Sequence, residues 1–265
     1  MAEINDRDFL LRRQYNDAAR LNARIALHAR FSTNPQGWQQ FVLDALQAHL
    51  PENADLLECG CGSAALWREN QPRVSGAWRL TLTDFSPGMV EQARVALGSR
   101  PNTRCAQADI QALPYADATF DGVIANHMLY HVADLPGALA NVRRVLRPGG
   151  RFFAATNGEA HMVEQWELAL RANPQLVNWH AQVMRSFSLE TGAAHLATVF
   201  EHVELLPYDD ALVVTEVEPL VAYAASMDLI PEEKYDDFAR LVADEMEANG
   251  GALRIGKQTG LFVAW

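Results

Sequence analysis

The sequence predicts an α/β fold: a three-layer, doubly wound sheet, mainly parallel, with helices on both faces. From residue 55 onward, short apolar segments alternate with helical segments of about a dozen residues. Parallel neighbouring strands need a long crossover between them, and a helix of that length supplies it. A chain of 265 residues is long enough for one such domain with a lid or a small appendage.

Two helices are expected before the first strand. Apolar residues recur at helical spacing over residues 8–31, and a second helix is expected over 36–50. The segment "STNP" between them offers capping side chains and a proline that suits a first helical turn.

Seven strands are expected from short apolar segments separated by turns and helices. The last one follows the break "GG" and alternates apolar with polar residues. Because no crossover helix follows it, we expect it to run antiparallel. The expected strands lie at 55–60, 78–86, 102–110, 120–129, 151–158, 203–216 and 252–265, and helices are expected at 63–70, 87–98, 135–146, within 159–200 and between 216 and 249.

The composition disfavours several functions. The formal net charge is −11 with only two lysines, whereas a duplex-binding protein needs a basic face, so nucleic acid is not an expected partner. No apolar segment predicts a membrane span, and the charged start "MAEINDRDFLLRRQ" does not resemble a secretory signal. Three cysteines without zinc-spaced partners predict neither disulfides nor a metal site, which favours a cytoplasmic location.

The segment "LLECGCGSAALW", residues 56–67, contains a glycine-rich turn that two cofactors could use. Gly60, Gly62 and Ala65 satisfy the dinucleotide pattern G-x-G-x-x-[GA], and Asp84 ends the next strand. With NAD in this turn, the Asp84 carboxylate would accept hydrogen bonds from ribose hydroxyls. The pattern alone therefore leaves an NAD-dependent oxidoreductase open.

Three features favour another ligand. Glu58 would repel a pyrophosphate held by the loop, but it suits a ligand with a positive group such as an ammonium. Asp109 ends the third strand, where its carboxylate can accept from an exocyclic adenine amine, with Ile110 beside it to pack on the ring. In addition, about 50 residues of mainly helical sequence precede the first strand. Dinucleotide-binding domains, in contrast, often begin with their first strand.

Four segments resemble, in order and spacing, the motifs of class I S-adenosylmethionine-dependent methyltransferases. They are "LLECGCGSAALW", "LTDFSPGMVEQAR", "ADIQALPYADATFDGVIANHMLYHV" and "VLRPGGRFFAAT". The most similar branch includes the ubiquinone/menaquinone C-methyltransferases and many small-molecule methyltransferases. The resemblance covers residues 54–156 and implies S-adenosyl-L-methionine as cofactor and the sheet order 3-2-1-4-5-7-6 with strand 7 antiparallel. At Ala64 the family usually has a third glycine, and we expect this change to affect helix packing without preventing cofactor binding.

The resemblance also implies roles for residues of the glycine-rich loop. Glu58 would organise the loop and the methionine end of the cofactor. Gly60 and Gly62 would let the backbone pass close to the cofactor. Asp84 would bind the ribose hydroxyls, although a carboxylate there can also serve as a turn or helix cap.

The later motifs carry the remaining implied cofactor contacts. Phe85 and Met89 would pack near the adenine, and Met89 can equally be a core residue of its helix. Asp109 and Ile110 would hold the adenine edge, with a cap again the alternative for Asp109. Asn126 would lie beside the methionine moiety, or cap the end of its strand.

Two histidines are candidates for catalysis. His127 and His131 follow the fourth strand, at the edge where ligands bind in open α/β sheets. An ordinary histidine pKa suits a general base, and the alternative is a packing or capping role. Tyr15, in the first helix, could close over the cofactor.

These observations predict methyl transfer from S-adenosylmethionine to a small, mainly apolar molecule by in-line displacement. The alternatives left open are a macromolecular acceptor, other chemistry with the same cofactor, or an NAD-dependent oxidoreductase. The acceptor atom and the oligomeric state are also open. We expect an N-terminal helical lid at 1–50, the cofactor-binding core at 51–158, a helical substrate lid at 159–200 and completion of the sheet at 201–265.

Overall fold

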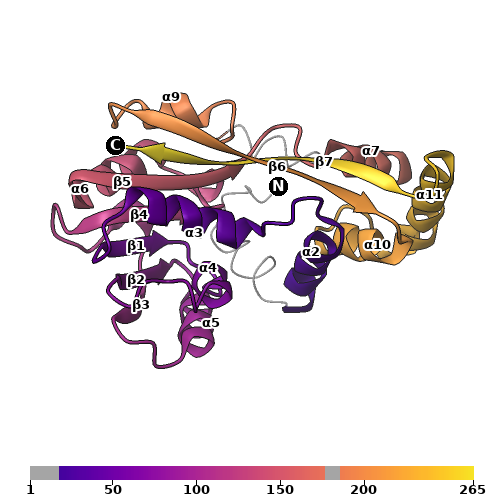
Figure 1. The fold of residues 1–265 in the computed structure, drawn as a ribbon. Helices are drawn as coiled ribbons and strands as arrows, with labels where there is room; N and C mark the ends of the chain where they lie inside the picture. Colours follow the sequence, from indigo (N-terminus) through magenta and orange to yellow (C-terminus); the bar gives the residue numbers. More distant parts are fainter. Residues whose placement is uncertain (1–17, 177–185) are drawn as a thin grey trace. The chain divides into compact units, whose positions relative to one another are not determined.

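The order of the strands confirms the predicted fold. The computed structural model describes residues 18–176 and 186–265 (Figure 1). It contains a seven-stranded sheet with the order β3-β2-β1-β4-β5-β7-β6. The strands are β1 (Asp55–Cys59), β2 (Arg79–Asp84), β3 (Thr103–Gln107), β4 (Phe120–Asn126), β5 (Leu146–Asn157), β6 (Val203–Val214) and β7 (Leu253–Ala264).

The pairing of the strands confirms the predicted direction of the last one. β1 pairs in parallel with β2 and β4, β2 with β3, and β4 with β5. β5 and β7 pair antiparallel, with Phe152 opposite Ala264 and Asn157 opposite Thr259. The parallel strands therefore end at one edge, where β1, β2 and β4 carry Glu58, Asp84 and Asn126 at or near their last residues.

The helices follow the predicted order. The helix expected over 8–31 is described from Ala18 onward, and residues 8–17 lie outside the described part of the chain. The α-helices are α2 (Ala18–Phe31), α3 (Trp38–His49), α4 (Ala65–Glu69), α5 (Pro87–Leu97), α6 (Leu135–Val145), α7 (Val163–Ala172), α9 (Gly192–Leu196), α10 (Val217–Ser226) and α11 (Tyr235–Ala248). Short 3-10 helices are η2 (Ile110–Ala112), η3 (Leu129–His131) and η4 (Glu232–Lys234).

Alternation along the central strands divides their side chains between two apolar cores. Leu57 of β1 and Val123 of β4 pack with α6 and α9 on one face, whereas Leu56 and Ile124 pack with α3, α4 and α5 on the other. Successive side chains of a strand point to opposite faces. Both faces of these strands are therefore covered, as the near-continuous apolar strand sequences predict.

The chain forms two compact units. Unit 1 contains the described parts of 1–35, 159–182 and 209–258, and unit 2 contains those of 36–158, 183–208 and 259–265. Unit 2 holds the parallel strands and both sheet-facing cores. Unit 1 holds α2, α7, α10 and α11 around a third apolar core. The four-part division expected from the sequence stays a prediction.

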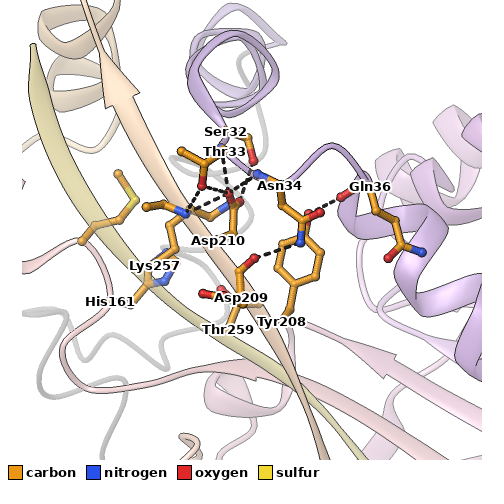
Figure 2. Close-up of polar contacts among 12 residues, drawn as sticks. Ser32, Thr33, Asn34, Gln36, His161, Tyr208, Asp209, Asp210, Lys257 and Thr259 are labelled. Carbon is orange, nitrogen blue, oxygen red and sulfur yellow. Dashed lines mark hydrogen bonds and ion pairs between the residues drawn. The ribbon is translucent and has the colours of Figure 1, made fainter.

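Unit 1 also contains a buried carboxylate with many partners (Figure 2). The Asp210 side chain is fully buried and forms an ion pair with Lys257. Its carboxylate accepts hydrogen bonds from Ser32 Oγ at 2.6 Å and from the backbone N–H groups of Thr33 and Asn34, each at 3.0 Å. Burial opposes ionisation, but the hydrogen bonds from Lys257, Ser32 and Asn34 prevail and hold the pKa of Asp210 below its ordinary value. This cluster fixes the segment after α2 to β6 and β7.

The expected helical segment 159–200 is divided between the two units. Trp166 of α7 packs in the core of unit 1, and Phe187 is fully buried in unit 2. Residues 177–185, with Trp179, lie outside the described part of the chain. Among the residues described, no helix has the length and apolarity that a bilayer crossing requires, and no group of three or more His, Cys, Asp or Glu side chains is placed to hold a metal ion.

Candidate cofactor site

The loop after β1 has a backbone conformation that explains its glycines. Gly60 has φ +70° and Gly62 has φ +51°, a left-handed region that L side chains rarely adopt. At Gly60 a Cβ atom would also lie 2.8 Å from Met128 Cγ. Ala64 likewise has φ +58°. A glycine would adopt this conformation with less strain, and the expectation that Ala64 alters helix packing without preventing cofactor binding stays a prediction.

Asp84 joins the end of β2 to this loop. Its Oδ2 accepts from Gly62 N at 2.9 Å, and its Oδ1 accepts from Ser86 N at 2.8 Å. Burial raises the pKa of Asp84, and these two backbone donors oppose the rise. The carboxylate thus serves as a turn acceptor, as one alternative predicted. Each carboxylate oxygen can accept more than one hydrogen bond, so both can still receive a ligand hydroxyl.

Glu58 lies buried beneath the same loop. It is 2% exposed, and Trp67 Nε1 donates to its Oε2 at 2.6 Å. Burial raises the pKa of Glu58 to about 7; the Trp67 hydrogen bond lowers it, and the charge of Asp84 raises it further. Near neutral pH this carboxyl group is therefore about half protonated, and a nearby positive charge would ionise it.

The residues predicted to contact the adenine follow the ends of β2 and β3. The Phe85 side chain is exposed, whereas Met89 is buried on the inner side of α5 and Ile110 is buried in the core with α6. Asp109 caps η2 by accepting from Gln111 N at 2.9 Å, so the capping alternative is also present here. Phe85 is thus partly accessible to solvent, whereas Met89 and Ile110 are largely covered.

Asn126, at the end of β4, has partners that the sequence did not reveal. Trp38 Nε1 donates to its Oδ1 at 3.0 Å, and its Nδ2 donates to Gln39 Oε1 at 3.4 Å. Both partners lie in the first turn of α3. Because the two contacts fix the orientation of the amide, Trp38 is a candidate positioning residue. An aromatic residue at a helix start was the only signal in the sequence.

Trp38 also belongs to an aromatic cluster with Phe41, His127 and Tyr208. The Trp38 ring centroid lies 5.0 Å from that of His127, 5.5 Å from Phe41 and 5.2 Å from Tyr208. Tyr208 Oη donates to Gln36 O at 2.5 Å, which holds the start of α3 (Figure 2). The end of β4 is therefore lined on the α3 side by aromatic surface.

The two predicted catalytic histidines have different surroundings. His127 has φ +57°, and its backbone N–H donates to Ala155 O at 3.2 Å. His131 ends η3, with its ring 4.6 Å from that of Tyr130. Burial lowers the pKa of His131 to about 4, so the ring is neutral at physiological pH and is a weaker base than an ordinary histidine. Tyr15 lies outside the described residues.

Comparison with known proteins gives the class of this site. Residues 57–154 match the family described as "Methyltransferase domain". A 2-phytyl-1,4-naphtoquinone methyltransferase from Thermosynechococcus vestitus is 32% identical over 136 residues, which cover 49% of this chain and 60% of that protein. A malonyl-[acyl-carrier protein] O-methyltransferase from Geobacter sulfurreducens is 31% identical over 173 residues, which cover 64% of this chain and 64% of that protein.

A solved structure shares the fold. Phosphoethanolamine N-methyltransferase 2 from Haemonchus contortus, in complex with S-adenosyl-L-methionine, matches with a TM-score of 0.61 at 17% identity, over 100% of this chain and 60% of that one. The fold and the matched segment agree with the resemblance to class I S-adenosylmethionine-dependent methyltransferases. Residues 57–154 thus match a methyltransferase domain, and quinone methyltransferases are among the proteins to which this segment is similar. The chain spans less than two thirds of the length of either curated relative named above.

Proposed function

We propose that the protein transfers the methyl group of S-adenosylmethionine to a small, mainly apolar molecule by in-line displacement. The observation that carries this proposal is the arrangement at the ends of β1 and β2. There, a buried Glu58 and an Asp84 that binds Gly62 enclose the glycine loop of the matched domain. The match to a methyltransferase domain, and a solved structure of the same fold that holds S-adenosyl-L-methionine, favour that cofactor over a dinucleotide for the loop.

The residues of the loop fit this cofactor. Backbone at Gly60 and Gly62 has no Cβ to hinder a ligand, and the spare lone pairs of Asp84 suit two ribose hydroxyls. Glu58 would ionise and become a counter-charge for the methionine ammonium. The sulfonium of the bound cofactor supplies an activated methyl group, so the protein must mainly align the acceptor and exclude water.

The remaining cofactor contacts are proposed from the later strand ends. The exposed Phe85 ring offers a stacking surface for adenine, with Met89 supporting it from α5. Asp109 would accept from the adenine amine while it caps η2, and Ile110 would pack beside it. Asn126 would contact the methionine moiety, in the orientation that its bonds to α3 impose.

The aromatic cluster beside Asn126 supports an apolar acceptor. Trp38, Phe41 and Tyr208 present rings rather than charges, and aromatic surface favours flat or apolar molecules. We propose that His127 and His131 contact the acceptor. A neutral His131 can hydrogen-bond a hydroxyl or carbonyl group without an added charge. The net charge of −11 disfavours nucleic acid as acceptor.

The test is transfer of tritium from methyl-labelled S-adenosylmethionine to defined acceptors. We would offer a reduced naphthoquinone, a simple phenol and a malonyl thioester, because the named relatives act on a naphthoquinone and on a malonyl carrier protein. Label in the organic extract of one acceptor supports the proposal. Asp84→Asn should reduce the rate, whereas the control Asp117→Asn, at an exposed carboxylate, should not.

Two results would contradict the proposal. Label that appears in protein or nucleic acid of a cell extract, and in none of the small acceptors, would favour a macromolecular acceptor. Oxidation of NADH by the purified protein, without any label transfer, would favour the oxidoreductase alternative.

A further inference from the structure

Unit 1 contains two strong hydrogen-bond donors whose partners within the described residues are thioether sulfurs. Arg24 Nη1 lies 3.5 Å from Met227 Sδ, and Tyr223 Oη lies 3.6 Å from Met162 Sδ. The Nε atom of Arg24 is buried and has no partner among the described residues. A thioether is a weak acceptor, so among the described residues neither the guanidinium nor the phenol has a partner that matches its strength.

These two donors belong to one place in the fold. Arg24 lies on α2 and Tyr223 on α10, and the two helices pack against each other (Figure 1). Met227, the residue that Arg24 contacts, caps α10 one turn after Tyr223, so the two donors lie near each other. Burial raises the pKa of Tyr223 to about 12, and the positive charge of Arg24 opposes this rise. Within the described part of the chain, Arg24 forms no ion pair with a carboxylate, although Arg30 on the same helix pairs with Glu216.

A third donor lies on α7, the helix that begins after Met162. Gln165 is 1% exposed, and its Nε2 has no partner among the described residues. The backbone N–H of Gln165 donates to Met162 O at 3.2 Å. Gln165 therefore lies one turn from Met162, the residue whose sulfur Tyr223 contacts. Buried polar groups are normally satisfied, and a group of unsatisfied donors costs stability. A fold can retain such a group where a ligand supplies the missing acceptors.

We propose that unit 1 binds the carboxylate of a small organic acid through Arg24 and Tyr223. Arg24 Nε and Gln165 Nε2 are donors without a partner among the described residues, and the Tyr223 hydroxyl can also donate, so a ligand with oxygen acceptors suits them. Arg24 brings one positive charge, which balances a carboxylate better than a phosphate dianion. The apolar core around Met162, Trp166 and Met227 suits a hydrophobic body attached to that carboxylate. This proposal does not depend on methyl transfer.

The first test is calorimetric titration of the full-length protein with benzoate and hexanoate, and with their neutral amides. We expect both acids to bind and the amides to bind at least tenfold more weakly. Arg24→Gln should weaken acid binding at least tenfold, and Tyr223→Phe by roughly three- to tenfold, as loss of one hydrogen bond gives. The control Arg30→Gln removes a charge from the same helix and should leave binding unchanged.

The second test separates a binding role from a structural one. Without ligand, Arg24→Met should leave the melting temperature unchanged or raise it, because it replaces an unsatisfied donor with an apolar group. A clear fall in melting temperature would make Arg24 structural and overturn the proposal. Equal binding of acid and amide, wild-type binding by Arg24→Gln and Tyr223→Phe, tighter binding of phenyl phosphate than of benzoate, or no binding of either acid would each overturn it as well.

Discussion

Replacing Glu58 with glutamine should change how the stability of the protein depends on pH. In the folded protein burial raises the Glu58 pKa to about 7, from an ordinary value of 4.5. Glutamine keeps the size of the side chain and can still accept from Trp67 Nε1, but it cannot ionise. The variant therefore removes one titration and leaves most of the packing in place.

The direction and the size of the change in stability with pH follow from the folded and unfolded pKa values of Glu58. Between pH 4.5 and 7 the unfolded chain has lost the Glu58 proton while the folded protein retains it, so stability falls as pH rises through this range. At about 1.4 kcal/mol for each pH unit, the fall attributable to Glu58 is about 3 kcal/mol. Below pH 4.5 the group is protonated in both states and contributes no slope.

The measurement is urea unfolding of wild type and Glu58→Gln at a series of pH values from 4 to 8, without cofactor. The free energy of unfolding of the variant, relative to wild type, should rise by about 3 kcal/mol across this range. The control Glu69→Gln, at a half-exposed carboxylate on α4, should give a curve parallel to that of wild type. Parallel curves for Glu58→Gln would refute the argument that Glu58 is buried with a raised pKa.

Four further changes test other parts of the structure. Gly60→Ala should destabilise the protein by about 1–3 kcal/mol, since the new Cβ has no room and φ is +70°; an unchanged urea midpoint would contradict this. Ala64→Gly should add about 1 kcal/mol of stability in the same assay, because φ is +58°, and a loss would count against it. Trp38→Phe removes the bond to Asn126, so the KM for S-adenosylmethionine should rise roughly tenfold with little change in melting temperature; an unchanged KM would remove its positioning role. Asp210→Ala leaves a buried lysine without its carboxylate and should cost about 3–5 kcal/mol in thermal or urea unfolding, whereas a cost below 1 kcal/mol would show that the cluster is dispensable.

Local sequence patterns predicted the sheet and the loop because both are encoded by neighbouring residues. Apolar runs with a period of two, separated by helical segments, mark the strands, and the carboxylates that follow them come to one edge because parallel strands end together. Glu58 and Asp84 were found in this way, and the structure places both against the loop.

Contacts between distant segments could not be predicted in the same way. Trp38 lies 88 residues before Asn126, and nothing in the sequence near either residue marks their hydrogen bond. Ser32 and Asp210 are 178 residues apart, and their cluster forms only when the strands after residue 200 return to the start of the chain. The pKa of His131 was also missed, because a sequence shows a histidine but not its burial.

Binding of S-adenosylhomocysteine tests the central claim most directly. Calorimetric titration of the full-length protein should give a dissociation constant of about micromolar order, the usual range for a cofactor. Asp84→Ala should lose roughly 2–5 kcal/mol of binding free energy, since ribose hydroxyls would lose a charged acceptor, whereas Asp117→Ala should bind as wild type does. A protein that binds NADH and not S-adenosylhomocysteine would contradict the account.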